Sequence, residues 1–143
     1  MNSEFPLLDA SDPTSCLCGR IMLSERIISG IYRKHLSQFD LTNSQLTILL
    51  VINRMGNISQ ADLSKMLVLE KSSVSRNMKR LLTSDYIKRG KARKLEITLN
   101  GKTLLESLIP AWDAAKAEVD EMLGEEGQEA MNMIVNKLTK NNF

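Results

Sequence analysis

The sequence contains few of the side chains that build enzyme active sites and metal centres. Its 143 residues include one histidine, His35, and two cysteines, Cys16 and Cys18. It has no glycine-rich phosphate-binding loop, no histidine pair at metal-ligand spacing and no nucleophile placed beside a base. We therefore expect the protein not to be an enzyme and to have no catalytic residues, no cofactor and no metal ion.

Aromatic residues and long apolar runs are scarce as well. Aromatics make up 4% of the chain while leucine, isoleucine and methionine abound, which favours packing of helices on helices over a β-sandwich. No apolar run approaches the roughly 18 residues needed to cross a membrane. The N-terminus lacks the basic start and long apolar core of a secretion signal, so we expect a cytoplasmic protein.

The charge of the chain is unevenly distributed. The net charge is only +2, but residues 71–94 carry nine lysines and arginines against one acid, Asp85, which gives this block a charge of +8. The rest of the chain therefore sums to −6. A strongly basic block within an otherwise acidic chain is typical of a protein that binds nucleic acid.

The first part of this block, residues 70–86, has the pattern of an amphipathic helix. Four apolar residues share one face at spacings i, i+4, i+7 and i+8: Val74, Met78, Leu81 and Leu82. The opposite face carries Ser72, Arg76 and Lys79. Short hydroxyls and long cations are the groups that read a DNA major groove. Taken alone, the pattern fits an ordinary solvated basic face equally well.

The stretches before this helix also have helical patterns. Residues 1–11 have no clear periodicity and form an arm, after which Asp12 and Pro13 begin a long helix that extends to about residue 38. A second helix covers residues 44–55 and stops at Gly56. Ser59 caps a short third helix, residues 60–68, expected to turn Ala61, Leu63, Met66 and Leu67 inward. This short helix and the basic helix, with a tight turn at Leu69-Glu70 between them, predict a helix-turn-helix.

The stretches after the basic helix predict a hairpin and two long helices. Residues 86–97 alternate in the manner of a β-hairpin, with a cationic tip and a tight turn at Gly90. Thr98 caps a helix with an expected kink at Pro110 and an end at Gly124. A last helix covers residues 125–140. The predicted fold class is therefore mainly α with a small β-hairpin.

Four junctions resemble one known family in their residues and order. They are Leu41-Thr42 with Gln45, Ile58-Ser59-Gln60 with Leu63, Val74-Ser75-Arg76 with Arg80-Leu81, and Ile97-Thr98 with Gly101-Lys102. This arrangement resembles the MarR family of bacterial winged-helix transcription regulators, over residues 17–115.

The resemblance implies a single MarR-like domain over residues 1–143. Residues 41–98 would form the winged helix-turn-helix lobe, and residues 12–40 and 99–143 the helices of a homodimer. Such a dimer would bind a pseudo-palindromic double-stranded DNA operator with half-sites about 10 bp apart. The implied activity is that of a repressor, released by a small-molecule effector or by oxidation. The alternative is a winged-helix module whose basic face binds protein or RNA.

The same resemblance assigns the candidate DNA contacts. On the recognition helix these are Ser72, Ser73, Ser75, Arg76, Lys79 and Arg80. The family wing usually carries an Asp–Arg signature in a longer hairpin, but residues 89–94 here read R-G-K-A-R-K without an aspartate. Arg93 is the first candidate at the wing, followed by Arg89 and Lys91. We expect a wing this short to touch phosphate and to leave sequence reading to the helix.

Three further features concern the two cysteines, the single histidine and the pair Trp112 and Met122. Cys16 and Cys18 fall in the first turn of a helix, where the dipole favours thiolate and redox sensing, but they equally fit one core thiol and one incidental thiol. A metal site with His35 would need a second subunit, because His35 lies about 25 Å further along a continuous helix. Trp112 and Met122 would line an effector cleft or simply pack in the core.

Overall fold

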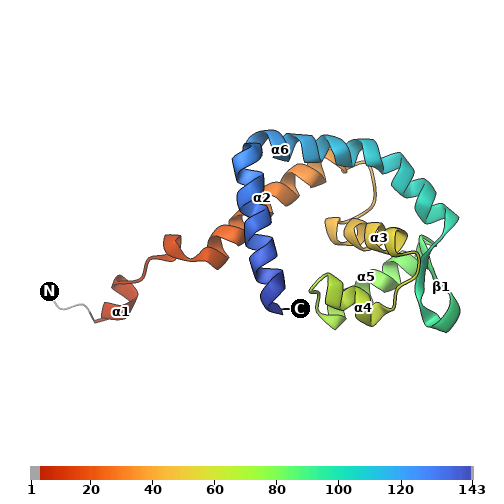
Figure 1. The fold of residues 1–143 in the computed structure, drawn as a ribbon, viewed down its shortest axis with the longest axis horizontal. Helices are drawn as coiled ribbons and strands as arrows, with labels where there is room; N and C mark the ends of the chain where they lie inside the picture. Colours follow the sequence, from red (N-terminus) through yellow and green to blue (C-terminus); the bar gives the residue numbers. More distant parts are fainter. Residues whose placement is uncertain (1–3, 143) are drawn as a thin grey trace.

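The computed structural model describes residues 4–142 and is mainly helical with one small hairpin (Figure 1). Its elements are α1 Pro6–Asp9, the 3₁₀ turn η1 Pro13–Ser15, α2 Leu17–His35, α3 Asn43–Met55, α4 Gln60–Met66, α5 Lys71–Thr83, β1 Ile87–Arg89, the 3₁₀ turn η2 Lys91–Arg93, β2 Leu95–Ile97 and α6 Leu99–Asn142. The predicted fold class is confirmed. Of the predicted N-terminal arm, residues 1–3 lie outside the described residues.

The core of the lobe lies between α3, α4, α5, the hairpin and the first half of α6. Ten side chains there are almost completely inaccessible: Ile48, Leu49, Ile52, Leu63, Val74, Met78, Leu81, Ile87, Leu95 and Leu108. The apolar face predicted for α5 is buried at Val74, Met78 and Leu81, while Leu82 is half-buried. Burial of each such side chain contributes about 1.5–3 kcal/mol, so packing fixes the orientation of α5.

The start and end of α3 follow from its sequence. The Thr42 hydroxyl accepts a hydrogen bond from the Gln45 amide at 3.2 Å, and the Gln45 side chain accepts one from the Thr42 amide at 3.1 Å. This reciprocal pair is a capping box, and it starts the helix at Asn43, one residue earlier than predicted. Gly56 ends the helix with a φ of 76°, as predicted.

The short helix α4 differs more from its prediction. Ser59 caps it as predicted, because its hydroxyl accepts a hydrogen bond from the Asp62 amide at 3.0 Å. The helix ends at Met66, two residues early, and Val68 has a φ of 51°. Leu63 is buried and Leu67 half-buried, but Ala61 and Met66 are exposed, contrary to the prediction. A helix of seven residues has too few turns to bury both ends of an apolar face.

The N-terminal helix begins later than predicted. Asp12 caps only the turn η1, where its carboxylate accepts a hydrogen bond from the Thr14 hydroxyl at 2.6 Å. The Ser15 hydroxyl donates to the Asp12 carbonyl at 2.8 Å, so these polar groups are satisfied locally and do not propagate a helix. Cys16 is then extended, with a φ of −69° and a ψ of 113°, and α2 starts at Leu17.

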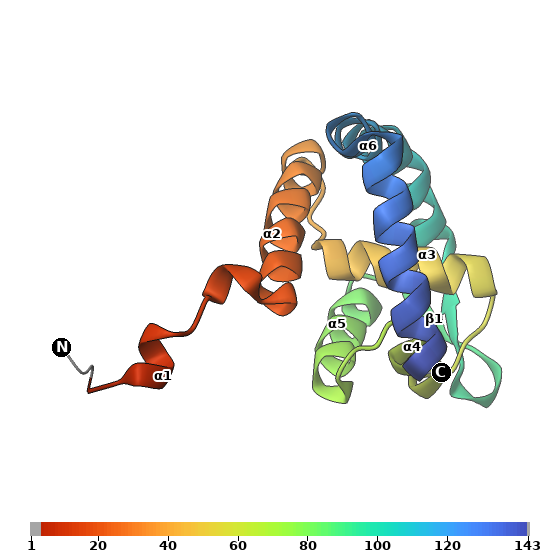
Figure 2. The same ribbon diagram turned by 60° about the vertical axis from the view of Figure 1, so that its left-hand side comes forward.

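The long helix α6 lies beside α2 and above α3, then turns back toward the lobe (Figures 1 and 2). The turn lies at Gly124, where a φ of 64° and a ψ of 179° interrupt the helix as predicted. Pro110 does not interrupt the helix, and the backbone torsions there stay helical. Pro110 is exposed, so its ring is accommodated on the solvent side of the helix.

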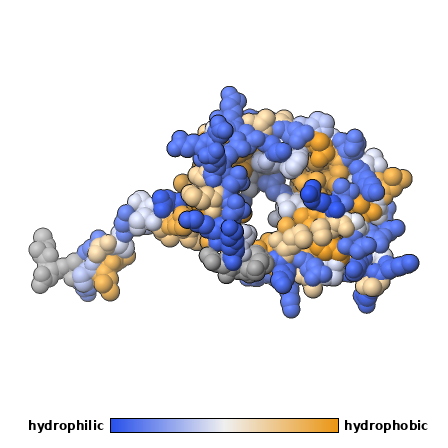
Figure 3. Space-filling view, in the orientation of Figure 1, coloured by the Kyte–Doolittle hydropathy of each residue, from blue (hydrophilic) through white to orange (hydrophobic). Residues whose placement is uncertain are grey.

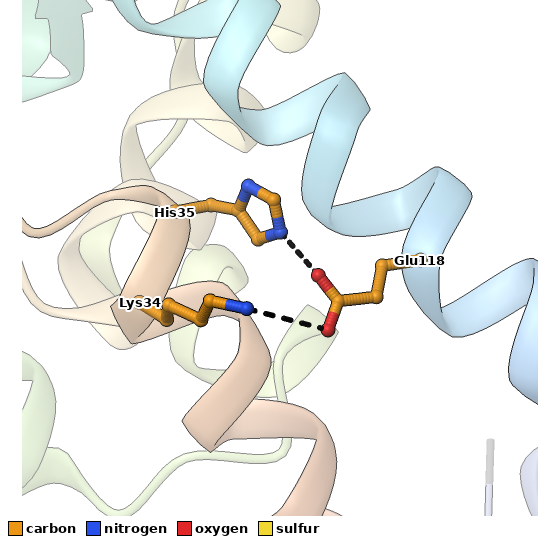
Figure 4. Close-up of polar contacts among 3 residues, drawn as sticks. All are labelled: Lys34, His35 and Glu118. Atoms are coloured by element: carbon orange, nitrogen blue, oxygen red, sulfur yellow. Dashed lines mark hydrogen bonds and ion pairs between the residues drawn. The ribbon is translucent and has the colours of Figure 1, made fainter.

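A small polar cluster joins the end of α2 to the middle of α6 (Figure 4). Nε2 of His35 lies 2.5 Å from Oε2 of Glu118, and Nζ of Lys34 lies 3.9 Å from Oε1 of the same carboxylate. The hydrogen bond to His35, with the positive charge of Lys34 adding to it, lowers the pKa of Glu118 below its ordinary value. His35 is thus half-buried in a contact between two helices.

Considerable apolar surface remains exposed outside the lobe. Exposed apolar side chains occur on α1, on the first half of α2 and on α6 after Val119: Leu7, Leu8, Leu17, Met22, Leu23, Ile27, Met122, Met133 and Val135. The space-filling view shows the N-terminal arm extending away from the lobe and the final part of α6 separated from the lobe by an opening (Figure 3). Within residues 4–142, none of the helices is apolar over a length sufficient to traverse a lipid bilayer.

Candidate nucleic-acid interface

The outer face of α5 carries the candidate DNA contacts, and these side chains are accessible. Ser72, Ser75, Arg76, Lys79 and Arg80 are exposed, and Ser73 is half-buried. Among the described residues, none of the three cations pairs with a carboxylate. Their charge is therefore not neutralised within the chain, and it lies directly opposite the buried apolar face of the same helix.

The polar side chains of α5 differ in their hydrogen bonding. Asn77 donates from its side chain to the Ser73 carbonyl at 3.1 Å, and the Thr83 hydroxyl donates to the Lys79 carbonyl at 2.8 Å. By contrast, the hydroxyls of Ser72 and Ser75 make no hydrogen bond to another described residue. These two side chains can donate to a ligand without breaking an internal bond.

A hollow of about 760 Å³ lies between one flank of α5 and the start of α3. Its wall includes Arg76, Lys79 and Arg80 from α5, together with Asp40 and Tyr86. The cations of the candidate interface thus border a concave surface as well as an exposed ridge.

The predicted hairpin is confirmed, with Ile87 opposite Ile97 and Arg89 opposite Leu95. The tight turn predicted at Gly90 follows directly after it, over η2 Lys91–Arg93. Gly90 does not supply the left-handed backbone, since its φ is −89°; Ala92 and Arg93 supply it, with φ values of 51° and 57°. Gly90 is needed for a different reason, because a Cβ atom there would clash with the Glu96 carboxylate.

The three candidate wing residues fall into two groups. Lys91 and Arg93 lie in the turn with exposed side chains. Arg89 lies at the end of β1 and donates from Nη2 to the side-chain oxygen of Gln60 at 3.1 Å. The functional role of all nine candidate residues remains a prediction.

No pattern in the sequence indicated the Gln60 contact. Gln60 is the first residue of α4, 29 positions before Arg89, and no periodicity links them. The contact depends on a backbone bridge that only the folded chain shows: Ile58 and Leu95 exchange hydrogen bonds of 3.1 and 2.8 Å. This bridge brings the start of α4 against the hairpin.

Both cysteines are exposed and free. Cys16 lies just before α2, not in its first turn, and Sγ of Cys18 lies 3.9 Å from Sδ of Met22. Exposure of both thiols argues against the interpretation of one as a core residue. Among residues 4–142 no three histidine, cysteine or carboxylate side chains are grouped so as to hold a metal ion.

Trp112 lines a cavity, whereas Met122 does not. The cavity has a volume of about 210 Å³ and lies between α2, α3 and α6, with Tyr32 and Leu46 also on its wall. Nζ of Lys116 lies 4.8 Å from the centre of the Trp112 ring, within the range of a cation–π contact. Met122 is 63% exposed, so it does not pack in the core of the single chain, and a cleft shared by the two residues remains a prediction.

Comparison with known proteins relates this geometry to one family. Residues 39–94, which include α3, α4, α5 and the wing tip, match the family model described as MarR family. A protein of Bacillus anthracis, described as an uncharacterized HTH-type transcriptional regulator, is 29% identical over 109 residues, covering 73% of this chain and 74% of the relative.

Solved structures share the fold over almost the whole chain. BpsR of Bordetella bronchiseptica, whose regulation of DNA binding by 6-hydroxynicotinic acid has been studied structurally, has a TM-score of 0.80 at 17% identity, covering 91% of this chain and 98% of that one. A mutant of MarR from E. coli complexed with operator DNA has a TM-score of 0.77 at 17% identity, covering 96% and 99%. The lobe therefore matches the MarR family model, and the chain shares the fold of MarR from E. coli over almost its whole length.

Proposed function

We propose that this protein is a transcriptional regulator that binds a double-stranded DNA operator as a homodimer. The observation that carries the proposal is the exposed cationic face of α5, held in place by an apolar face that is buried in the lobe. Arg76 and Lys79 project from the middle of this helix, where a recognition helix in the major groove reaches bases and phosphates. The relatives described above, a transcriptional regulator and an operator-bound MarR, support the proposal.

The proposed division of labour follows the exposure of each group. Ser72, Ser75, Arg76 and Lys79 read the major groove, with Ser73 and Arg80 at the flanks of the helix. Lys91 and Arg93 bind the DNA backbone from the wing. Because the turn holds only three residues, η2 Lys91–Arg93, its reach is short and the helix carries the sequence preference.

The homodimer is proposed because the chain has apolar surface that it cannot cover itself. Both the first half of α2 and the last part of α6 expose leucine, isoleucine and methionine at helical spacing. Exposed apolar faces of this extent are typical of an interface. Residues 12–40 and 99–143 would form it, and a two-fold axis would place the two α5 helices on half-sites about 10 bp apart.

Selection of duplexes from a random-sequence pool, followed by fluorescence anisotropy, tests the proposal. We expect one pseudo-palindromic sequence to bind at least ~10³-fold more tightly than random duplex. Arg76→Ala should weaken binding to that sequence by about 1–3 kcal/mol and relax its preference at one position in each half-site. Arg54→Ala on α3 removes the same charge away from α5 and from the proposed dimer interface, and it should not alter the preference. Equal binding of all duplexes would refute sequence-specific regulation.

Two triggers for release are proposed, a small ligand and oxidation. The cavity beside Trp112 has room for a compound of about one ring, and closing on it would change the packing of α2 against α6. The exposed thiols of Cys16 and Cys18 are open to oxidants. Release of the selected duplex by peroxide in the wild type but not in Cys16→Ser or Cys18→Ser would assign the trigger to the thiols.

A lobe that binds protein or RNA through its basic face is the alternative. It predicts no preference among DNA duplexes, and tighter binding of a single-stranded or structured RNA at the same salt concentration. The selection experiment therefore distinguishes the two functions directly.

A further inference from the structure

Arg89 is the one cation of the wing whose side chain is held at two points. Its Nη2 donates to Oε1 of Gln60 at 3.1 Å, and its Nη1 lies 3.5 Å from the carbonyl oxygen of Arg93. The first contact reaches α4 and the second reaches the turn of the hairpin. The guanidinium therefore lies between the helix-turn-helix and the wing tip, and its rotation is restricted from both sides.

The backbone around Gln60 is itself fixed. Two residues earlier, Ile58 forms the bridge to Leu95 with two backbone hydrogen bonds. One residue earlier, Ser59 caps α4 and bonds the Asp62 side chain at 2.6 Å. Since Leu95 is also the strand partner of Arg89, the same pairing sets the positions of both ends of the Gln60–Arg89 contact.

The partner of Arg89 is neutral, which distinguishes this contact from an ion pair. Glu96 is the one acid among residues 86–97, and it is opposite Lys88, whose Nζ lies 3.8 Å from its Oε2. Arg89 therefore keeps its full positive charge while its geometry is held. A guanidinium has five N–H donors, and the two contacts leave three for a ligand.

We propose that Gln60 is a positioning residue that holds Arg89 ready to bind a phosphate of the DNA backbone. The inference rests on the proposed DNA-binding function. A long side chain that is already ordered loses less conformational freedom when it binds, and ordering one such side chain costs about 0.5–1.5 kcal/mol. In this wing the side-chain amide of Gln60, on the neighbouring helix α4, orients the Arg89 guanidinium. Within residues 4–142 no carboxylate pairs with that guanidinium, so its positive charge is available to a phosphate.

The test is a double-mutant cycle measured on a random-sequence duplex of about 30 bp, because phosphate binding does not need the operator. Gln60→Met keeps the length of the side chain but removes its acceptor. For each protomer of the bound dimer, loss of one phosphate contact lowers the magnitude of the slope of log K against log salt by about 0.9, which is roughly a five- to tenfold loss of affinity per protomer near 0.1 M salt. We expect this for Arg89→Ala, and a loss of about threefold for Gln60→Met.

Two further comparisons separate positioning from other roles. Gln60→Met should have no additional effect in the Arg89→Ala background, but its full effect in the Lys88→Ala background, where a neighbouring charge on the other face of the strand is removed. Arg89→Lys keeps the charge and cannot span both contacts, so it should bind less tightly with a nearly unchanged salt slope and be insensitive to Gln60→Met. Melting temperatures of all variants are measured alongside, and Arg89→Lys replaces Arg89→Ala in the cycle if the latter does not fold.

The outcomes distinguish failure of the proposed DNA-binding function from failure of the positioning role of Gln60. If the wild type binds no duplex, the proposed function itself fails. If the wild type binds but Arg89→Ala binds equally well, Arg89 does not contact DNA and the positioning role is overturned. It is also overturned if Gln60→Met has no effect, or weakens binding equally with and without Arg89.

Discussion

Replacement of Gly101 by alanine should destabilise the protein although alanine is the better helix former. Gly101 is buried in the first turn of α6, and a Cβ atom there would clash with the Tyr86 carbonyl oxygen and lie 2.8 Å from Cγ1 of Ile97. The Tyr86 oxygen is backbone, and it accepts a hydrogen bond from the Thr98 amide at 3.0 Å. It cannot move aside without breaking that bond.

The expected magnitude follows from three contributions. Overpacking against a rigid neighbour costs about 1–3 kcal/mol, and weakening the Thr98–Tyr86 hydrogen bond costs about 1 kcal/mol more. The higher helix propensity of alanine offsets about 1 kcal/mol of this loss, because glycine is the poorest helix former after proline. The net loss is then about 1–3 kcal/mol, which for a chain of this size lowers the melting temperature by about 3–9 °C.

Gly19→Ala is the matched control, because it makes the same chemical change in another helix. A Cβ atom at Gly19 would meet nothing closer than Cβ of Cys16 at 3.9 Å, an ordinary contact. Only the propensity gain remains, so this variant should melt about 2–3 °C higher than the wild type.

Thermal unfolding followed by far-UV circular dichroism measures both variants. All samples need one protein concentration, since association of copies raises the melting temperature by mass action. If Gly101→Ala melts within about 2 °C of the wild type, or if both variants shift in the same direction, the close packing of α6 on the end of α5 is refuted.

Two further predictions concern the wing and the α2–α6 contact. Ala92→Gly should stabilise the protein by about 0.5–1 kcal/mol, because alanine at a φ of 51° is strained and glycine is not; a higher urea midpoint with an unchanged m-value would show it, and a lower midpoint would contradict it. Glu118 has a lowered native-state pKa, so its contribution to stability is complete above its ordinary value of 4.5 and is lost as the pH falls through the native value. Glu118→Gln should therefore melt lower than the wild type at neutral pH and equal to it at the acid end of a pH series; a difference that does not depend on pH would argue against this account.

The sequence predicted the elements that local chemistry determines. The apolar face of α5, the caps at Ser59 and Thr98, and the helix ends at Gly56 and Gly124 each depend on residues a few positions apart. Periodicity and capping report such short-range relations directly, and these predictions are confirmed.

The errors arose where distant parts of the chain decide the outcome. Met66 and Met122 have the spacing of core residues, but nothing within the single chain covers them. The left-handed backbone of Ala92 and the closeness of Gly90 to Glu96 had no signal in the sequence, because the pairing of the two strands determines both. Gln60 could not be found at all, since its partner is brought to it by the pairing of Ile58 with Leu95.

The hydroxyl of Thr98 connects the start of α6 to the segment that follows α5. It donates to the Asp85 carbonyl at 2.6 Å, just beyond the end of α5, and accepts from the Gly101 amide at 3.0 Å. From this connection α5 extends away over 13 residues, a length of about 20 Å. A rotation of the lobe by about 10° about the Thr98 contact would move the far end of α5 by about 3.4 Å, which is the axial rise of one base pair. On the proposed function, a change in the packing of α6 that rotates the whole lobe by this angle would displace α5 by about one base-pair step along the DNA.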